Sequence, residues 1–581
     1  MAECLSGHEN CSKSDATQDK HNRPARLLDL TPISREGELG IRLIETTQTG
    51  TYQYACLSHR WDTALKHHQT TQDNLTKALE FLHLRVQPKN FQDAVHIARQ
   101  LNIQYLWIDS LCIIQGGNGD DLRRELAKMA YIYRNARLTI AIVSSPDSSE
   151  GCFMHNKWPD TCLSITSSKN EHYLLGARIL DKKGQSRSTS EVNAHYPLLN
   201  RAWVFQERLL STRLLECNYG EFAFQCLESS RCECDSLIAP HIGRNSHRSR
   251  NSNLVHQRRL IVQGAQSLRK QGARDAWKHD VLNYWKNIIE VYMQLELSYP
   301  ADVLPAIAGC AQVLAEHLKF RYVAGMWREM LATDLLWYVT PTKARETVKP
   351  RPKDSTAPSW SWASVAMGQS IAHVHWMGDR SLSMSDVLLR DAIKDIHCEP
   401  LSEVNPFGKL KSASLRLEAV LYPWYLHFFC RLYKQEMICA YRRSSKDLFI
   451  KRDRPDGFVD CRTEIQELDV QGKVIEISLD VRLGDEGLAV EPFSRCIKGP
   501  PNPCALAQIY LLHALHKENR SPRRMFDVFL ILMRTAPVGD MSNCYRRIGL
   551  MKMTNVGMTA RTWRDIVDRR MEFGPEEFWL L

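Results

Sequence analysis

Polar side chains that could carry chemistry stand at the ends of two apolar runs. Asp109 and Ser110 directly follow the aromatic and β-branched run 105–108, and a second polar group ends the run 52–58. A polar group beside buried residues costs free energy unless a hydrogen bond or a ligand compensates it. We therefore expect the polar side chains at these positions to have such a partner. The candidate side chains are Ser58, His59, Arg60, Trp61, Asp109 and Ser110. They offer a carboxylate, an imidazole, a guanidinium, hydroxyls and an indole to a ligand.

The segment 91–142 predicts how these side chains are positioned. Apolar residues at helical spacing predict helices over 91–101 and 120–133, and apolar runs predict buried strands at 105–108 and 138–143. This order, with short connections, predicts a parallel sheet covered by helices, which binds ligands at the carboxyl ends of its strands. We therefore expect one pocket at that edge. Gln115 and Glu125 join it, because the helix that carries Glu125 begins near the same rim.

A catalytic nucleophile is less well supported by the sequence. Ser58 and His59 are adjacent, and adjacent residues of a strand point to opposite faces, so they form no dyad while the strand continues. No serine stands in a GxSxG turn, and the sequence has no GxxxxGK[ST] or GxGxxG phosphate loop. We therefore expect GGNG at 116–119 to be a flexible turn and Cys112 to be a small buried hydrophobe.

Metal ligands of the zinc type crowd one stretch of the sequence. They are Cys226, Cys232, Cys234, His241 and His247. Zinc sites normally pair cysteines with two to four residues between them, whereas one residue separates Cys232 from Cys234 and the other spacings are irregular. We therefore expect no metal site, and reduced, partly buried thiols at these positions.

The composition is that of a globular chain with more than one domain. Of the 581 residues, 44% are hydrophobic and 24% are charged. No apolar run of about 18 residues is present, so no membrane span is expected, and the polar start of the chain lacks the apolar region of a secretory signal. The 18 cysteines are too few for a disulfide scaffold. We expect reduced thiols and a cytoplasmic protein, with the nucleus left open.

The positive charge of the chain does not point to nucleic acid. The net charge is +10, and much of the excess lies between Arg244 and Lys278. Neither aromatic interleaving nor a DNA-binding motif accompanies these residues. A solvated loop and a charged helix face are favoured over a nucleic-acid partner.

Changes of pattern along the chain predict four regions. We expect a disordered tail at 1–26 and an α/β core at 27–153, which holds the parallel sheet. A mainly helical extension follows at 154–375, with a basic connector at 235–275. Runs with period-two alternation then predict a β-rich C-terminal region at 376–581.

Several long blocks resemble the fungal heterokaryon-incompatibility (HET) domain. YACLSHRW at 54–61, FQDAV at 91–95, YLWIDSLCIIQ at 105–115 and MAYIYRNARLTIAI at 129–142 match its blocks in order. NRAWVFQERLLSTRLL at 200–215, APSWSWASV at 357–365 and, more weakly, YRRIGL at 545–550 resemble blocks of longer HET proteins. The resemblance implies a sheet of Toll/interleukin-receptor (TIR)-like or flavodoxin-like order. It also implies a role in fungal non-self recognition and programmed cell death, with self-association or an incompatibility partner.

The likeness of HET domains to TIR domains implies an alternative function, that of an NAD-consuming glycohydrolase. Some TIR domains cleave the ribose–nicotinamide bond of NAD with a glutamate. On this hypothesis Glu125 is the catalytic carboxylate beside Asp109, and Trp61 or Trp107 forms the wall of the slot. His59 or Arg60 then holds a phosphate. NAD would be a substrate, and we expect no resident cofactor.

A third hypothesis is a non-catalytic interaction or scaffold protein. Three residues depart from the family pattern at the expected rim: Asp62, Gly116 and Leu122 stand where the family usually has Gly, Asp and Trp. These departures indicate either an altered ligand preference or a site no longer in use.

Overall fold

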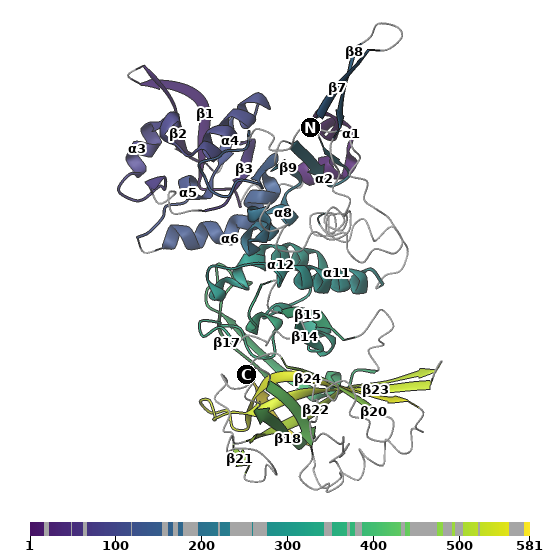
Figure 1. Cartoon of the computed structure of the whole chain (residues 1–581). Coiled ribbons are helices and arrows are strands. Elements are labelled where there is room, and N and C mark those ends of the chain that lie inside the picture. Colours follow the sequence, from purple (N-terminus) through teal and green to yellow (C-terminus); the bar gives the residue numbers. More distant parts are fainter. Residues whose placement is uncertain are drawn as a thin grey trace. The chain divides into compact units, whose positions relative to one another are not determined.

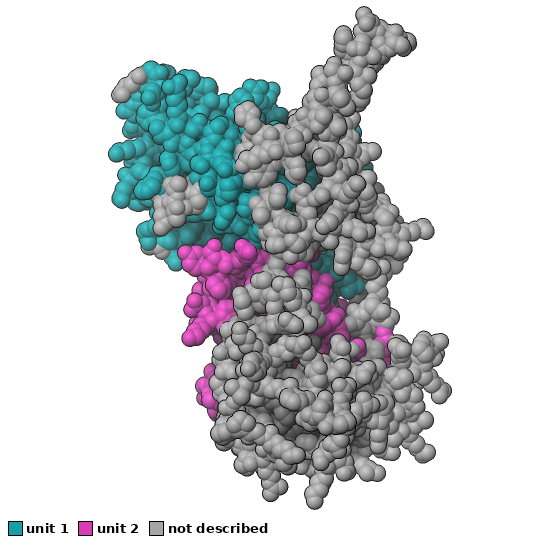
Figure 2. Space-filling view, in the orientation of Figure 1, with its two compact units in different colours: residues 1–288, 305–319 teal, residues 289–304, 320–581 magenta. Residues whose placement is uncertain are grey.

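The chain divides into two compact units (Figure 2). Unit 1 consists of Met1–Ile288 and Pro305–Lys319, and unit 2 of Ile289–Leu304 and Phe320–Leu581. The computed structural model describes residues 1–16, 22–35, 37–47, 49–61, 67–117, 119–153, 161–166, 172–177, 196–218, 221–232, 258, 276–341, 351–368, 372–377, 386–430, 436–441, 473–479, 491–493, 504–520, 523–556 and 575–581.

Unit 1 contains a nine-stranded mixed sheet in the order β11-β10-β9-β6-β3-β5-β1-β2-β4. Its strands are β1 (Arg26–Arg35), β2 (Glu38–Glu45), β3 (Tyr54–Ser58), β4 (Leu82–His83), β5 (Tyr105–Trp107), β6 (Leu138–Ile142), β9 (Arg213–Asn218), β10 (Glu221–Cys226) and β11 (Ser230–Cys232). β5, β3, β6 and β9 are parallel neighbours, and the flanking strands pair antiparallel. Counted along the chain, these four lie in the order 2-1-3-4. The expected parallel sheet is confirmed, while its TIR-like or flavodoxin-like assignment stays a prediction.

The parallel strands are connected by helices, as the sequence pattern predicts. The helices of unit 1 are α1 (Ala2–Gly7), α2 (Glu9–Ala16), α3 (Leu75–Glu80), α4 (Lys89–Gln100), α5 (Asp109–Cys112), α6 (Asp120–Asn135), α8 (Ala202–Leu210) and α12 (Pro305–Leu318), with 3₁₀ turns η2 (Leu84–Val86) and η3 (Pro197–Asn200). α4 packs on β3 and β5, whereas α6, α8 and α12 contact one another (Figure 1). Each apolar helix face is buried in this way, which stabilises the sheet between its helices.

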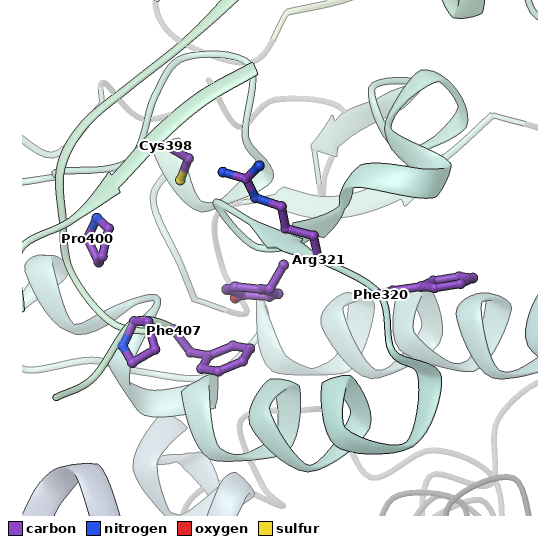
Figure 3. Close-up of a pocket in the computed structure, with 7 residues that line it drawn as sticks. Phe320, Arg321, Cys398, Pro400 and Phe407 are labelled. Carbon is purple, nitrogen blue, oxygen red and sulfur yellow. The ribbon is translucent and has the colours of Figure 1, made fainter. Parts of the chain in front are cut away.

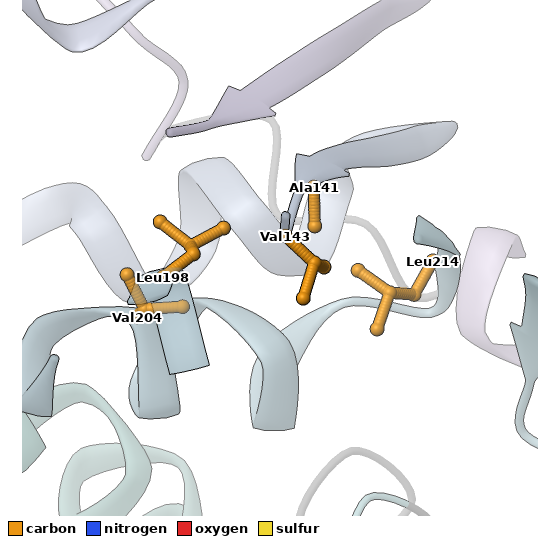
Figure 4. Packing of buried hydrophobic residues seen from close by; sticks show 5 residues of the cluster. All are labelled: Ala141, Val143, Leu198, Val204 and Leu214. Atoms are coloured by element: carbon orange, nitrogen blue, oxygen red, sulfur yellow. The ribbon is translucent and has the colours of Figure 1, made fainter. Parts of the chain in front are cut away.

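A small apolar cluster fixes α8 against the sheet. Ala141 and Val143 of the β6 end pack with Leu214 of β9, and Leu198 and Val204 bring η3 and the start of α8 to them (Figure 4). All five side chains are at most 2% exposed. Burying the valine and leucine side chains of this cluster stabilises the fold by roughly 1.5–3 kcal/mol each. The cluster therefore determines where the rest of α8 lies.

Unit 2 is mainly β-structure. Its described strands are β12 (Tyr322–Val323), β13 (Met326–Trp327), β14 (Trp337–Pro341), β15 (Ala372–Trp376), β16 (Ile393–Pro400), β17 (Leu410–Ala419), β18 (Leu421–Cys430), β19 (Glu436–Tyr441), β20 (Lys473–Leu479), β21 (Glu491–Phe493), β22 (Cys504–Arg520), β23 (Arg523–Arg534), β24 (Cys544–Val556) and β25 (Glu576–Leu580). β16 to β25 form one sheet, in which β24 and β25 are the parallel pair. The prediction of a β-rich C-terminal region is confirmed. The short helices are η4 (Pro300–Asp302), η5 (Arg328–Met330), α13 (Leu331–Asp334), η6 (Trp362–Ser364) and α14 (Leu389–Ala392).

The structure differs from the sequence prediction in three regions. The expected disordered tail contains α1 and α2. The sheet does not end at 153, because β9, β10 and β11 continue it. The expected helical extension contains α11 (Ala276–Tyr292) and α12 but also β7 (Thr161–Thr166), β8 (His172–Ala177) and β12 to β15, since its aromatic and β-branched residues suit strands. Of the basic connector 235–275, only Arg258 lies among the described residues.

Among the helices that the structure describes, none combines the length and the apolar character that crossing a membrane requires.

Candidate functional site

The end of β3 sends its side chains to two faces of the sheet. Ser58 is 1% exposed and its hydroxyl donates to Glu207 Oε2 of α8 at 2.5 Å. His59 is also buried, but its ring packs edge-on against Phe91 of α4, with centroids 5.1 Å apart. Because α8 and α4 lie on different sides of β3, Ser58 and His59 form no dyad, as the alternation of a strand predicts.

Glu207 is a buried carboxyl group at this edge of the sheet. It is 6% exposed and accepts a hydrogen bond from the Ser58 hydroxyl, while the nearby Tyr133 hydroxyl donates to the Leu57 carbonyl at 3.4 Å and also lowers the pKa of Glu207. Burial raises the pKa of Glu207 from 4.5 to about 7, and the charge of Asp109 adds to this rise, while the two hydroxyls and Arg201 oppose it. At neutral pH this carboxyl therefore exists in both protonation states, which suits it to give or take a proton.

Asp109 begins α5 directly after the end of β5. Its Oδ1 accepts the backbone N–H of the next residue, Ser110, at 2.8 Å. Its Oδ2 accepts the indole N–H of Trp61 at 2.8 Å. Trp61 and Asp109 thus meet across the ends of two neighbouring parallel strands, as the sequence predicts for residues at this edge.

Ser58, Trp61, Asp109, Tyr133 and Glu207 together form what we call the acidic centre. Four elements supply it: the end of β3, the start of α5, α6 and α8. Two carboxyl groups with different surroundings and two aromatic side chains are present, so the arrangement can stabilise positive charge and transfer a proton. Trp107, the other expected wall residue, is fully buried and packs edge-on against Tyr133, with ring centroids 5.6 Å apart.

Glu125 is engaged in structural interactions. It is 1% exposed, and its Oε2 accepts the backbone N–H of Ala25 at 3.0 Å while its Oε1 pairs with Lys128 Nζ at 2.8 Å. Both carboxylate oxygens are therefore occupied: the bond from Ala25 attaches α6 to the residue before β1, and Lys128 belongs to α6 itself. This environment favours a structural role for Glu125 over the catalytic role implied by the resemblance.

The remaining expected rim residues have local partners. Arg60 is exposed and donates to the carbonyl of Pro146 at 3.0 Å, while the side chain of Gln115 donates to the carbonyl of Ile113 at 3.1 Å. Ser110 is buried, and its carbonyl accepts the N–H of Thr70 at 3.0 Å. None of these three contacts connects Arg60, Gln115 or Ser110 to the acidic centre.

Of the three departures from the family pattern, the glycine at 116 is explained by its backbone conformation. Gly116 has a φ of +79°, the left-handed region in which glycine is favoured. Leu122 is half-buried in the first turns of α6, and Asp62 lies outside the described residues.

Sequence reasoning missed Glu207 and Tyr133 as site residues. Glu207 lies 149 positions after Ser58 and reaches it only because α8 precedes a strand of the same parallel sheet. The available signal was a carboxylate within the largely apolar block AWVFQERLL, where an unpaired charge is costly. Such a residue needs a partner, although the sequence does not say which one.

The described part of unit 2 contains a separate pocket. It is lined by Phe320, Arg321, Tyr322, Cys398, Pro400, Pro406 and Phe407, and its volume is about 310 Å³ (Figure 3). Most of the lining is aromatic or aliphatic, and Arg321 supplies the charged group. No residue of the acidic centre lines this pocket, so the two places are distinct candidates.

Of the five zinc-type residues in this stretch of the sequence, two lie among the described residues. Cys226 is fully buried at the end of β10, and Cys232 is the last residue of β11. Cys234, His241 and His247 lie outside the described residues.

Comparison with known proteins identifies one matching family. Residues 54–207 match the family model for Heterokaryon incompatibility protein (HET). The match begins at Tyr54, the first residue of β3, and ends at Glu207, so it spans the whole acidic centre. No curated protein and no solved structure matches the chain.

Proposed function

Because the chain carries a HET domain at residues 54–207, we propose that it acts in fungal heterokaryon incompatibility, in non-self recognition that leads to programmed cell death. We further propose that the acidic centre is the part of the domain on which this activity depends. The observation that carries this proposal is the buried Glu207 with a pKa of about 7, close to the charge of Asp109. Strongly perturbed carboxyl groups concentrate at functional sites.

A purely structural role for the same residues is the competing explanation. The Ser58 hydroxyl donates to Glu207 and the Tyr133 hydroxyl to the Leu57 carbonyl, and such a network can stabilise a core without any further task. A structural network, however, gains nothing from a second carboxylate nearby, since the charge of Asp109 raises the pKa of Glu207 and opposes its ionisation. This repulsion favours a functional explanation.

Induced expression in a fungal host tests the proposal. We expect the wild-type chain to arrest growth and kill cells. Trp61→Phe removes the N–H that binds Asp109, and Asp109→Asn removes the charge, so both variants should lose killing. Arg123→Ala is the matched control, because Arg123 is an exposed residue of α6 whose ion pair is with Asp120. Killing that persists in both variants at equal protein levels would refute the role of the acidic centre.

A second candidate is an NAD-consuming glycohydrolase of TIR-like type. The 2-1-3-4 order of the parallel strands, as in flavodoxin-like sheets, supports it, as does the pairing of Trp61 with Asp109 at their carboxyl ends. An oxocarbenium-like ribose needs a carboxylate nearby, and its leaving group needs space beside an aromatic wall. We assign the carboxylate role to Asp109 and Glu207 rather than to Glu125, whose oxygens are bound to Ala25 and Lys128.

Nicotinamide release from NAD by the purified chain tests this second candidate. We expect Glu207→Gln and Asp109→Asn to lower the rate roughly 100-fold or more, the scale of a lost acid or base. Glu125→Gln should keep most of the activity if it folds. Absence of release by wild-type protein, including forced oligomers, together with cell killing would favour the third hypothesis. The domain would then act through self-association or an incompatibility partner.

A further inference from the structure

Three thiols and an imidazole from distant parts of unit 1 come together beside the sheet. They are Cys4 of α1, His8 between α1 and α2, Cys11 of α2 and Cys226 at the end of β10. One ligand atom of each lies within 4.8 Å of the other three. The three cysteines are at most 2% exposed and His8 is half-buried. Figure 1 shows α1 and α2 at the N-terminus, next to β9.

The spacing of these residues is that of a metal-binding segment. Three residues separate Cys4 from His8, and two separate His8 from Cys11. His8 is extended between the two helices, with φ −95° and ψ 106°, so the turn from α1 into α2 brings Cys4, His8 and Cys11 to one place. Spacings of this length are usual among the paired ligands of structural zinc sites.

The distances also fit one metal ion. Tetrahedral zinc with Zn–S bonds of about 2.3 Å places its sulfurs roughly 3.8 Å apart. The ligand atoms here lie within 4.8 Å of one another, and Cys226 Sγ is 3.2 Å from His8 Nδ1. Small side-chain rotations therefore suffice to bring the four atoms to bonding distance of a common centre.

The surroundings of the sulfurs suit thiolates. Cys226 Sγ accepts the backbone N–H groups of Ser229 at 3.3 Å and Glu228 at 3.4 Å, and it lies 3.4 Å from the Ser229 hydroxyl. The buried Arg213 donates its Nε–H to Cys4 Sγ at 3.3 Å. Donors around the ligand atoms stabilise negative sulfur and orient it toward a metal.

We propose that Cys4, His8, Cys11 and Cys226 bind one structural zinc ion. Three thiolates and one imidazole form a Cys₃His set, which is closed and leaves no coordination position for a substrate. Thiolate-rich tetrahedral sites select zinc over the harder magnesium and calcium ions. The metal would attach α1 and α2 to the turn between β10 and β11.

Contacts around the four ligands indicate the same attachment. The backbone N–H of Asn10 donates to Glu228 Oε1 at 2.6 Å, and Arg231 pairs with Glu3 at 3.0 Å. The apolar part of the contact is small, since the buried cluster contains Cys4, Cys11, Cys226 and Leu227 with Phe224 packed against it. Two short helices with so little apolar burial need a further source of stability, which a metal supplies.

Metal content of the full chain tests the proposal directly. Protein produced with zinc in the medium and purified under a reducing agent should contain one zinc per chain by mass spectrometry. Cys11→Ser and Cys226→Ser should lower this to about a tenth or less, because each removes a ligand from a closed site. Cys232→Ser is the matched control, since Cys232 ends β11, six positions from Cys226, and is not one of the four proposed ligands, so this variant should keep one zinc.

Two measurements keep the test decisive if a cysteine variant fails to fold. Cobalt(II) added to chelator-treated wild-type protein should give the absorption of a tetrahedral, thiolate-bound ion. His8→Ala keeps all three thiolates, and we expect it to bind zinc at least roughly tenfold more weakly in competition with a chromophoric chelator. Wild-type protein without zinc after reconstitution, or full zinc content in folded Cys226→Ser, would overturn the proposal.

Discussion

At the scale of single residues, the environment of Glu207 is the most informative feature. Burial favours its neutral form, and the nearby charge of Asp109 adds to this effect. The difference between 4.5 and about 7 corresponds to roughly 3 kcal/mol of preference for the protonated acid. Because ionising Glu207 in the folded protein costs this much free energy, its protonation state should affect both stability and activity.

The stability of unit 1 should therefore decrease with rising pH. Folded Glu207 keeps a proton that the unfolded chain has lost between pH 4.5 and about 7. Its stabilising contribution is complete below pH 4.5 and is lost as pH rises through about 7. We expect denaturant unfolding at several pH values to show this decrease in the wild type and not in Glu207→Gln. An unchanged pH profile in Glu207→Gln would contradict the raised pKa.

Ser58→Ala offers a complementary test of the same group. The Ser58 hydroxyl donates to Glu207 and lowers its pKa, so its removal should raise this pKa further. The pH at which stability is lost should then move upward. If the pH at which stability is lost moves downward instead, the Ser58 hydroxyl does not stabilise the ionised form of Glu207.

Glu125 should behave as a structural residue. Glu125→Gln removes the ion pair with Lys128 and weakens the bond from Ala25, so we expect a loss of about 1–3 kcal/mol in the free energy of unfolding. Lys128→Met, measured beside it, should cost less, because Lys128 is partly exposed. A variant as stable as the wild type would show that these contacts do not hold α6.

The sequence predicted some site residues and not others, for a physical reason. Trp61 lies three residues after the end of β3 and Asp109 two residues after the end of β5, so local pattern and sheet topology suffice to predict that they meet. Glu207 depends on the position of α8, which the cluster around Leu198 and Val204 determines. The four zinc ligands depend on a contact between α1–α2 and β10, more than 200 positions apart. No local pattern contains such contacts.

At the scale of elements, the packing of α12 on α6 and α8 depends on one glycine. A Cβ on Gly309 would lie 2.7 Å from Ala130 Cβ and 2.8 Å from Gln206 Oε1. The backbone N–H of Gly309 also donates to Gln206 Oε1 at 2.6 Å. The missing side chain thus allows both the close approach and the hydrogen bond between these helices.

Gly309→Ala should destabilise unit 1 by about 1–3 kcal/mol, the usual cost of overpacking, even though alanine favours a helix. Ala130→Gly in the same chain should recover part of the loss by making room for the new methyl group. A double-mutant cycle of thermal or denaturant unfolding measures this coupling. Additive effects would show that the two helices do not meet at this point.

The elements with strong periodicity were predicted well. The patterns at 91–101 and 120–133 correspond to α4 and α6, and those at 105–108 and 138–143 to β5 and β6. Within the expected helical extension, the segment 323–338 favoured a helix by its pattern but forms β12, β13, α13 and the start of β14, and its tryptophans at 327 and 337 are fully buried in unit 2. α1 and α2 escaped prediction because their few buried residues are cysteines, which give no apolar period.

At the scale of the whole molecule, each unit has its own core. In unit 2, the blocks APSWSWASV and YRRIGL meet at Arg547, which is fully buried. Its guanidinium donates to the carbonyls of Leu335 and Trp337 and lies 3.7 Å from the centroid of the Trp337 ring. The Ser359 hydroxyl accepts the backbone N–H of Arg547 at 3.0 Å. Two blocks that resemble longer HET proteins thus form one structural network.

Arg547→Met should destabilise unit 2 by about 2–5 kcal/mol, because two buried carbonyls lose their charged donor. Limited proteolysis followed by peptide mapping should show faster cleavage within residues 320–581. Arg416→Met is the control, since Arg416 pairs with Glu577 at a more exposed position and should change little. Equal cleavage of both variants and the wild type would contradict the structural role of Arg547.

The most direct test of the acidic centre is cell viability after induced expression of Glu207→Gln and Glu125→Gln beside the wild type. Both substitutions keep the shape of the side chain and remove its charge. We expect folded, accumulating Glu207→Gln to be harmless and Glu125→Gln to kill as the wild type does. Killing by Glu207→Gln, together with loss of killing in folded Glu125→Gln, would contradict our assignment. The carboxylate required for killing would then be Glu125 of α6.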